Sequence, residues 1–197
     1  SAGIMGNIKF PAELMLDNLL IACHIIDSSY RHGVKKLLYL ASNCCYPRDC
    51  PQPMCENALL SGPLEPTNES YAVAKIAGLK LVQSYRNQYG ADFICGIPAN
   101  SFGPGDDFSE DNSHVFGALI RRIHEAKKEN KDSVVVWGTG KPRREFMYID
   151  DLADACIFLM NNYSGLEPVN LGPGGDISIA ELANMLKSVV GFKGELV

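Results

Sequence analysis

The segment YAVAK contains a tyrosine and a lysine, Tyr71 and Lys75, at a spacing of four residues. On an α-helix, two residues at this spacing project from the same face. A phenol alone is a poor acid at neutral pH, with an ordinary pKa of about 10, and an ammonium ion beside it favours the phenolate. The pair could therefore pass a proton to or from a carbinol oxygen. The alternative is an exposed Tyr and Lys that share a helix face without doing chemistry.

Three further side chains have chemistry that suits such a site. Ser42 follows the apolar run KKLLYLA, and its hydroxyl could hydrogen-bond the same oxygen. Cys44 or its neighbour Cys45 offers a thiol and His114 an imidazole, two groups whose ordinary pKa values lie within a few units of neutrality. Each has a structural alternative, because free cysteine is often a small buried hydrophobe. His114 could serve only in packing or at a helix start, where Asp111, Asn112 and Ser113 are equally good N-caps.

Strands alternate with helices along the chain, and this alternation would position these side chains. Helices are expected from Pro11 to about Tyr30 and from about Ser70 to Tyr89. KKLLYLAS and DFICGIPAN are typical of strands buried on both faces of a parallel sheet, with the Pro- and Asn-rich segment 48–68 between them as loop. The later expected elements are a helix over 113–128, a strand over 133–138, a turn over 138–142, the segment EFMYI, a helix over 150–162, the strand PVNLG, a turn at Gly172, Gly174 and Gly175, and a last helix that starts at a Ser178–Glu181 capping box and ends before Gly191.

This order of elements predicts an α/β protein with a Rossmann-like, doubly wound parallel sheet. In such sheets ligands gather at the carboxyl ends of the strands. Ser42 and Asn100 are expected at two such ends.

The composition narrows the class of protein. Of 197 residues, 46% are hydrophobic and 21% charged, as in a soluble globular domain. A net charge of -5 argues against nucleic acid as a partner. No apolar run approaches the roughly 20 residues of a membrane span, and the first residues lack a secretory pattern. The seven cysteines show no paired zinc-site spacing, so we expect no metal and reduced thiols in the cytoplasm.

Five segments together resemble the GDP-L-fucose synthase family of extended short-chain dehydrogenases/reductases: SNCCYP, PLEPTNESYAVAKIAGLKL, GPGDDFSEDNSHV, VVVWGTGKPRREF and YIDDLADA. The resemblance covers essentially the whole chain in one register. It implies NADP(H) as cofactor and a GDP-sugar as substrate. The implied reaction is epimerisation of GDP-4-keto-6-deoxy-D-mannose at C3 and C5, followed by reduction of the C4 ketone to GDP-L-fucose.

The resemblance also implies a role for each site residue. Cys44 and His114 match the proton-exchanging groups of the epimerisation, and Ser42, Tyr71 and Lys75 match the groups that reduce the ketone. Asn18 lies on the helix that supports the catalytic lysine in the family. The implied cofactor contacts are Ser42, Tyr71, Lys75, Pro98, Ala99, Asn100, Ser101 and His114, and the implied substrate contacts are Asn100, Arg122, Trp137 and Arg144. Without the resemblance, Arg121 and Arg122 could be a solvated helix face, and a single Trp is often core.

This sequence differs from the family pattern at both of its ends. The family opens with a strand and a Gly-rich turn that holds the cofactor pyrophosphate, and neither this motif nor the family's C-terminal segment has a counterpart here. We therefore expect residues 1–110 to form a partial NADP-binding domain. Residues 111–197 are expected to form a mixed segment that contributes a substrate-binding lobe and returns a strand and a helix to the sheet.

Two readings other than a GDP-L-fucose synthase stay open. One is a neighbouring nucleotide-sugar epimerase or dehydratase, which the presence of both Cys44 and His114 disfavours. The other is a catalytically silent nucleotide-sugar-binding fragment, which the intact Ser42, Tyr71 and Lys75 set disfavours. By analogy with the superfamily, the helices at 11–30 and 70–89 predict a homodimer.

Overall fold

The computed structural model describes residues 3–110 and 113–197. Its centre is a parallel sheet of three strands in the order β1-β2-β7. In this sheet Tyr39 lies opposite Cys95, and Pro98 lies opposite Leu171. The three strands are β1 (Lys36–Leu40), β2 (Asp92–Pro98) and β7 (Val169–Leu171).

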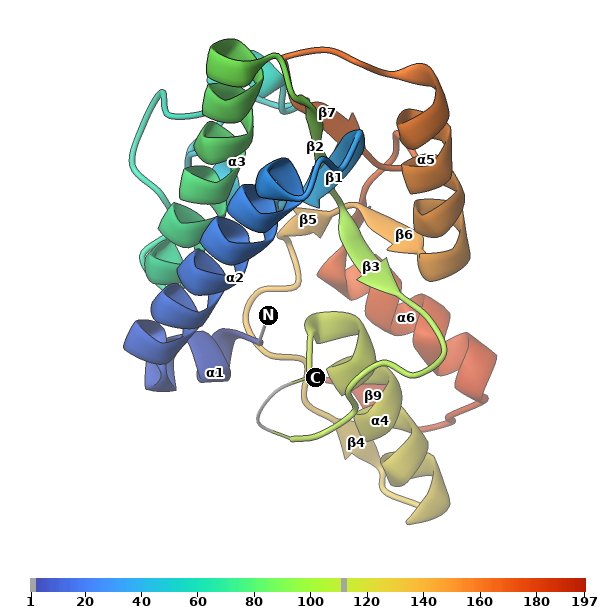
Figure 1. Cartoon of the computed structure of the whole chain (residues 1–197). Helices are drawn as coiled ribbons and strands as arrows, with labels where there is room; N and C mark the ends of the chain where they lie inside the picture. Colours follow the sequence, from blue (N-terminus) through green and yellow to red (C-terminus); the bar gives the residue numbers. More distant parts are fainter. Residues whose placement is uncertain (1–2, 111–112) are drawn as a thin grey trace.

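Helices cover both faces of this sheet (Figure 1). On one face, α2 (Pro11–Arg31) and α3 (Glu69–Tyr89) pack against each other and the strands, while α5 (Ile149–Asn162) covers the opposite face. This two-sided burial explains why the strands are continuous apolar runs with no polar alternation. The Rossmann-like fold expected from the sequence is confirmed.

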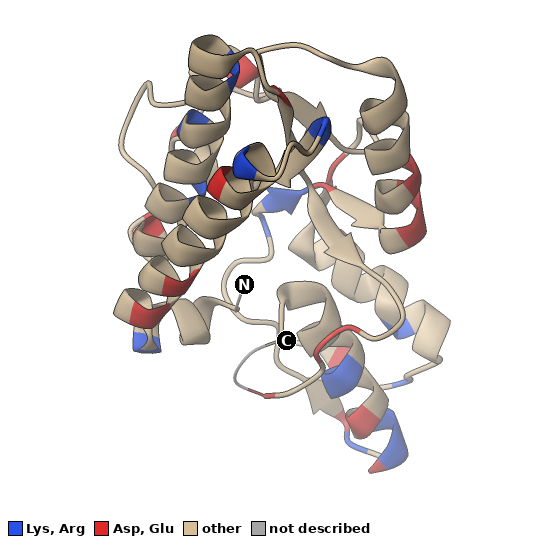
Figure 2. Cartoon of the chain, in the orientation of Figure 1, with Lys and Arg blue, Asp and Glu red and all other residues tan. Residues whose placement is uncertain are grey.

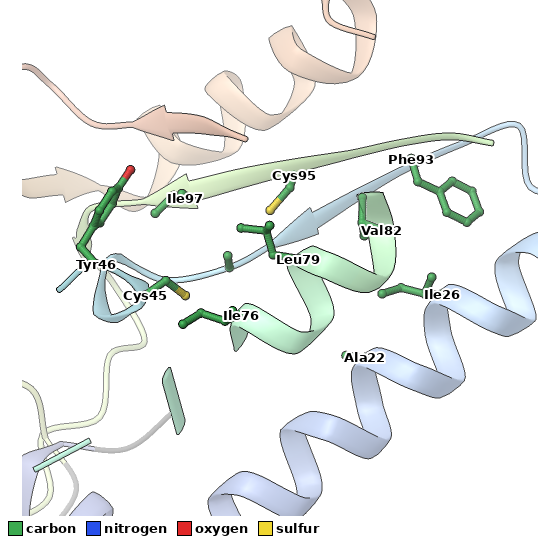
Figure 3. Close-up of a cluster of buried hydrophobic side chains, with 11 residues drawn as sticks. Ala22, Ile26, Cys45, Tyr46, Ile76, Leu79, Val82, Phe93, Cys95 and Ile97 are labelled. Atoms are coloured by element: carbon green, nitrogen blue, oxygen red, sulfur yellow. The ribbon is translucent and has the colours of Figure 1, made fainter. Parts of the chain in front are cut away.

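The side chains of β2 divide between two cores, because successive residues of a strand point to opposite faces. Phe93, Cys95 and Ile97 face α2 and α3, whereas Ile94 faces α5. Figure 3 shows the first of these cores, with side chains of α3 lying between the helix and the strands. Its buried residues are Ala22, Ile26, Ala41, Cys45, Tyr46, Ile76, Leu79, Val82, Phe93, Cys95 and Ile97.

Leu79 is almost fully buried at the centre of this core. The Leu79→Ala variant removes packing and leaves a cavity, so the free energy of unfolding should fall by about 2–5 kcal/mol. Urea denaturation measures this change. The control is Leu166→Ala, because Leu166 is exposed, and that substitution should change stability by less than about 0.5 kcal/mol. Equal effects of the two variants would contradict the packing described here.

A second part of the molecule lies below the sheet in Figure 1. Its core is formed between α4 (Val115–Lys128) and α6 (Ile179–Val190), together with the two-stranded pair of β4 (Ser133–Val134) and β9 (Glu195–Leu196). The predicted capping box is confirmed: Ser178 accepts from the backbone of Glu181, and the Glu181 side chain accepts from the Ser178 backbone. This helix ends, as predicted, before Gly191, which has a φ of 73°.

Short elements connect the two parts. β3 (Asn100–Phe102) pairs in parallel with β6 (Phe146–Tyr148), and β5 (Arg143–Arg144) pairs antiparallel with β8 (Ile177–Ser178). Residues 149–171 return to the sheet as α5 and β7. The remaining elements are α1 (Ile4–Lys9) and the 3-10 turns η1 (Asn43–Cys45) and η2 (Glu56–Ala58).

Two elements differ from their expected bounds, which for the helix were about 113 to 128. The strand expected over 133–138 is shorter in the structure: Ser133 and Val134 pair with β9, the backbone of Val136 donates to the Val197 carbonyl at 2.6 Å, and the side chains of Val135 and Trp137 are exposed. The helix expected from residue 113 begins at Val115, so His114 is its N-cap and Ser113 lies outside it. The candidate caps Asp111 and Asn112 lie outside the described residues. In the described part of the chain, no helix combines the length and apolarity that crossing a bilayer requires.

Candidate active site

The structure brings Ser42, Tyr71 and Lys75 together at the carboxyl end of β1. Tyr71 and Lys75 lie in the first two turns of α3, on the side of the helix that faces the sheet. Ser42 follows the strand and is the N-cap of η1, where its Oγ accepts from the backbone of Cys44 at 3.3 Å. A side-chain hydrogen bond connects Ser42 with Tyr71.

Lys75 is held without a carboxylate partner among the described residues. Its Nζ donates to the carbonyl of Leu40 at 3.1 Å and lies 5.3 Å from the ring centroid of Tyr39 and 5.8 Å from that of Tyr71. Burial lowers the pKa of this ammonium from its ordinary value. An ammonium has three N–H donors, and the Leu40 carbonyl is the one hydrogen-bond acceptor described for Lys75. Its remaining donors fit the hydroxyls of a nucleotide ribose.

The sequence-based expectation for the Tyr71 hydroxyl needs a correction. Lys75 was expected to favour the phenolate, yet the pKa of Tyr71 is raised to about 12. Burial is the largest cause and the nearby Cys44 adds to it, while the hydrogen bond with Ser42 acts in the opposite direction. Tyr71 is therefore protonated at neutral pH and is set up to donate a proton.

Of the adjacent cysteines Cys44 and Cys45, Cys44 is half-buried and Cys45 is buried. The Sγ of Cys44 accepts from Nδ2 of Asn68 at 3.1 Å and donates to Oδ1 of Asn43 at 3.8 Å. Cys45 is fully buried in the core, contacts the Ala72 carbonyl at 3.9 Å, and has its pKa raised to about 11 by burial. The placement of the two thiols therefore favours Cys44 for chemistry and Cys45 for packing.

Residues 98–101 run from Pro98 at the end of β2, through the connecting Ala99, to Asn100 and Ser101 of β3, at the same edge of the sheet as Ser42. The backbone of Ala99 donates to the Leu171 carbonyl at 2.8 Å. Asn100 donates twice to the carbonyl of Glu145, from its backbone at 3.2 Å and from Nδ2 at 3.0 Å. These bonds hold residues 98–101 in place. The carboxyl ends of β1 and β2 lie side by side here, because the backbone N–H of Ala41 donates to the Gly96 carbonyl at 2.9 Å.

His114 is not joined to this cluster by any hydrogen bond or ion pair among the described residues. It is the exposed N-cap of α4 and makes no side-chain cap bond. The pKa of the nearby Asp107 carboxyl is lowered mainly by two hydrogen bonds from Ser109, and the charge of His114 lowers it further. Asn18, expected to support Lys75, instead donates to the Leu14 carbonyl of its own helix at 2.7 Å.

The cations expected to bind a diphosphate have no carboxylate partner in the described part of the chain. Arg122 stacks on Trp137 at 4.9 Å from the ring centroid and donates to the Val135 carbonyl, while burial lowers its pKa. By contrast, Arg121 pairs with Glu125. Arg122 is therefore available to an anion, and the exposed indole of Trp137 offers a flat surface.

Arg143 and Arg144, like Arg121 and Arg122, are neighbours of which one has carboxylate partners and the other has none among the described residues. Arg143 is paired with Asp176 at 2.8 Å and Glu181 at 3.3 Å, whereas within the described residues the side chain of Arg144 bonds only the Arg143 carbonyl, at 2.7 Å. Both lie on β5, which Figure 2 shows as a basic strand between the two parts of the molecule. In the part of the chain that the structure describes, Arg144 is thus the cation of the pair without a carboxylate partner.

The predicted residues form two groups. Ser42, Cys44, Tyr71 and Lys75 lie together beside the 98–101 connection, whereas His114, Arg122 and Trp137 belong to the second part. A pocket of 350 Å³ between α4 and α6 is lined by Phe108, Ile120, Arg121, His124 and Val190, and includes none of the predicted site residues. Among the described residues, no group of three or more His, Cys, Asp or Glu side chains could hold a metal ion.

Sequence reasoning missed Asn68 and Tyr39. Asn68 contacts the Cys44 thiol, and the Tyr39 ring lies beside the Lys75 ammonium. An Asn three residues before Tyr71 looks like an ordinary helix cap, and a Tyr in a buried strand looks like core. Only the spacing of Asn68 from the YAVAK segment could have drawn attention to it.

The fold and the Ser/Tyr/Lys cluster define a member of the NAD dependent epimerase/dehydratase family, to which this chain belongs: the family model matches residues 1–172. The chain is 57% identical over 194 residues to "GDP-L-fucose synthase 1" of Arabidopsis thaliana, covering 98% of this chain. It spans 60% of the length of that relative.

Two solved structures are also similar. The first is a GDP-D-glycero-L-gluco-heptose synthase from Campylobacter jejuni in the presence of NADPH, with a TM-score of 0.91 and 36% identity over 98% of this chain and 68% of that one. The second is a GDP-L-fucose synthetase from Naegleria fowleri bound to NADP, with a TM-score of 0.89 and 32% identity over 97% of this chain and 59% of that one.

Proposed function

We propose that this protein converts GDP-4-keto-6-deoxy-D-mannose to GDP-L-fucose, by epimerisation at C3 and C5 and reduction at C4 with NADPH. The observation that carries the proposal is the cluster of Ser42, Tyr71 and Lys75 with the Cys44 thiol beside it. The 57% identity to a GDP-L-fucose synthase of Arabidopsis thaliana supports the substrate.

For the reduction, a bound NADPH would supply hydride to C4. Tyr71 is protonated at neutral pH and donates its proton to the C4 oxygen as negative charge develops there. Ser42 contacts Tyr71 and hydrogen-bonds the same oxygen. Lys75 uses its remaining N–H donors to hold the ribose.

For the epimerisation, C3 and C5 both flank the C4 ketone, which makes their protons acidic. One group removes a proton and leaves an enolate, and a second group on the opposite side returns a proton to invert the centre. Cys44 and His114 are the two groups proposed for this exchange. Because they belong to different parts of the chain, the sugar would lie between the sheet and α4.

Binding of the GDP moiety is assigned to the second part of the molecule. Arg122 and Arg144 lack carboxylate partners and suit the diphosphate, because a guanidinium presents forked donors to phosphate oxygens. Trp137 offers its exposed ring to a flat or apolar group. We therefore propose that residues 1–110 serve mainly the cofactor and the Ser/Tyr/Lys site, and residues 111–197 mainly the substrate.

The test is NADPH oxidation on addition of GDP-4-keto-6-deoxy-D-mannose, followed by absorbance, with GDP-D-mannose as control because it has no ketone. The proposal expects oxidation with the ketone only, and GDP-L-fucose as product. A second candidate is a GDP-heptose C4 reductase, which the TM-score of 0.91 to a Campylobacter jejuni heptose synthase favours. Oxidation with a 4-keto-heptose substrate alone would select the second candidate.

We also propose a homodimer that buries the outer face of α2. Leu16, Leu20, Ile21 and Ile25 of this helix are exposed large hydrophobic residues, and apolar patches of this kind mark association surfaces. The Ile21→Asp variant should convert the dimer to a monomer in light scattering at micromolar concentration. Ile157→Asp is the matched control, because Ile157 is 60% exposed on α5 and Ile21 is 61% exposed. A monomeric unsubstituted protein would refute the dimer.

A cytoplasmic location is part of the same proposal. All seven cysteines are free thiols, which suits a reducing compartment.

A further inference from the structure

We propose that Asn68 is a positioning residue for Cys44: its amide N–H donates to the sulfur and holds it in place for proton exchange. The inference rests on the proposed function, in which Cys44 exchanges protons with the sugar. It starts from the contact of 3.1 Å between Nδ2 of Asn68 and Sγ of Cys44.

This contact differs from those of the other cysteines. Cys45, Cys55 and Cys95 each direct the sulfur to a backbone carbonyl, at 3.6 to 3.9 Å. Among the described residues, Cys44 is the one whose sulfur accepts from a side-chain N–H. The thiol hydrogen of Cys44 is directed to Oδ1 of Asn43, so the sulfur lone pairs are left for Asn68.

The orientation of Asn68 is not explained by the helix that it starts. Asn68 is the N-cap of α3, a position where the Asn side chain normally accepts from the backbone of the first turn. Here it makes no cap bond and is turned to Cys44 instead. The first turn relies on Glu69 and on the backbone, where Ala72 donates to the Asn68 carbonyl at 3.0 Å.

The carbonyl oxygen of the same Asn68 amide is an acceptor without a hydrogen-bond partner among the described residues. Oδ1 of Asn68 is buried and has no partner among the described residues, and buried carbonyl oxygens nearly always have one. Because the two atoms share one amide group, this acceptor lies beside the thiol. Among the described residues, the amide is therefore held by its bond to the thiol and not by a second partner at its oxygen.

The chemical consequence follows from the direction of the bond. The thiolate, not the thiol, removes a proton, and an N–H donor stabilises the negative sulfur. Removing this donor should therefore slow every reaction of Cys44 that depends on the thiolate, with little effect on distant thiols.

The experiment is alkylation by iodoacetamide, with the rate at each cysteine read by peptide mass spectrometry across a pH series. It compares Asn68→Ala with Asn68→Asp, which keeps size and capping ability but replaces the donor by a carboxylate. Alkylation of Cys44 at neutral pH should slow about tenfold in Asn68→Ala and further in Asn68→Asp. The exposed Cys23 and Cys55 should keep their rates. An unchanged rate and pH profile at Cys44 in both variants would overturn the proposal.

A second readout separates this proposal from the proposed function. Deuterium uptake at C3 and C5 of the keto-sugar in D₂O should slow in Asn68→Asp by at least the factor seen in alkylation, and undiminished uptake would overturn the role of Asn68. If the unsubstituted protein exchanges no deuterium while alkylation still responds to Asn68, the proposed function fails and the coupling between Asn68 and the thiol stands.

Discussion

The Tyr71→Phe variant is expected to lose ketone reduction by a factor of about 10² to 10⁴, the usual contribution of a general acid. The substitution keeps the buried ring and removes only the hydroxyl that bonds Ser42. Because the pKa of Tyr71 lies at about 12, above the ordinary value of 10, the phenol stays protonated through the neutral range. The deficit should therefore be constant from about pH 6 to about pH 9. NADPH oxidation under single-turnover conditions measures it.

The control for this variant is Tyr46→Phe. Tyr46 is also buried, and its hydroxyl donates to Oδ1 of the exposed Asn170 at 2.6 Å. Tyr46→Phe should lower the melting temperature but retain reduction. A Tyr71→Phe variant that reduces the ketone within about threefold of the unsubstituted rate would show that Tyr71 is not the acid.

The Cys44→Ser variant is expected to slow deuterium exchange at C3 and C5 by about 10² or more, because a serine hydroxyl is a far weaker acid than a thiol. Ser42, Tyr71 and Lys75 are untouched, so NADPH oxidation should continue and give a product with unchanged configuration at C3 and C5. Nuclear magnetic resonance of the product distinguishes the two configurations.

Cys45→Ala decides between the adjacent thiols. Cys45 is fully buried and its pKa is raised to about 11 by burial, so we expect this variant to lose stability and keep the exchange. Loss of exchange in Cys45→Ala, with exchange retained in Cys44→Ser, would reverse the assignment.

The sequence alone predicted the sheet because its strands are uninterrupted apolar runs between well-marked helices. KKLLYLAS and DFICGIPAN became neighbouring parallel strands, and the helix over Ser70–Tyr89 was placed within a residue of α3. The strand expected over 133–138 was too long: Ser133 and Val134 pair with β9, and Val136 adds one backbone bond to Val197. An apolar run such as VVVW does not reveal which of its residues pair.

The site was predictable in part. The spacing of Tyr71 and Lys75 on a helix, and the position of Ser42 after a strand, follow from local pattern. The raised pKa of Tyr71 does not, because the burial that raises it comes from the packing of α3 on the sheet. Likewise the choice of Cys44 over Cys45, and the contact of Asn68 with the thiol, depend on the turn η1 that directs one sulfur outward and the other into the core.

The central claim is that one site both inverts two carbons and reduces the ketone between them. The most direct measurement is the mass of the product formed from GDP-4-keto-6-deoxy-D-mannose and NADPH in D₂O. We expect GDP-L-fucose with deuterium fixed at both C3 and C5. A reduced product with no deuterium at either carbon would contradict it, because reduction would then occur without proton exchange.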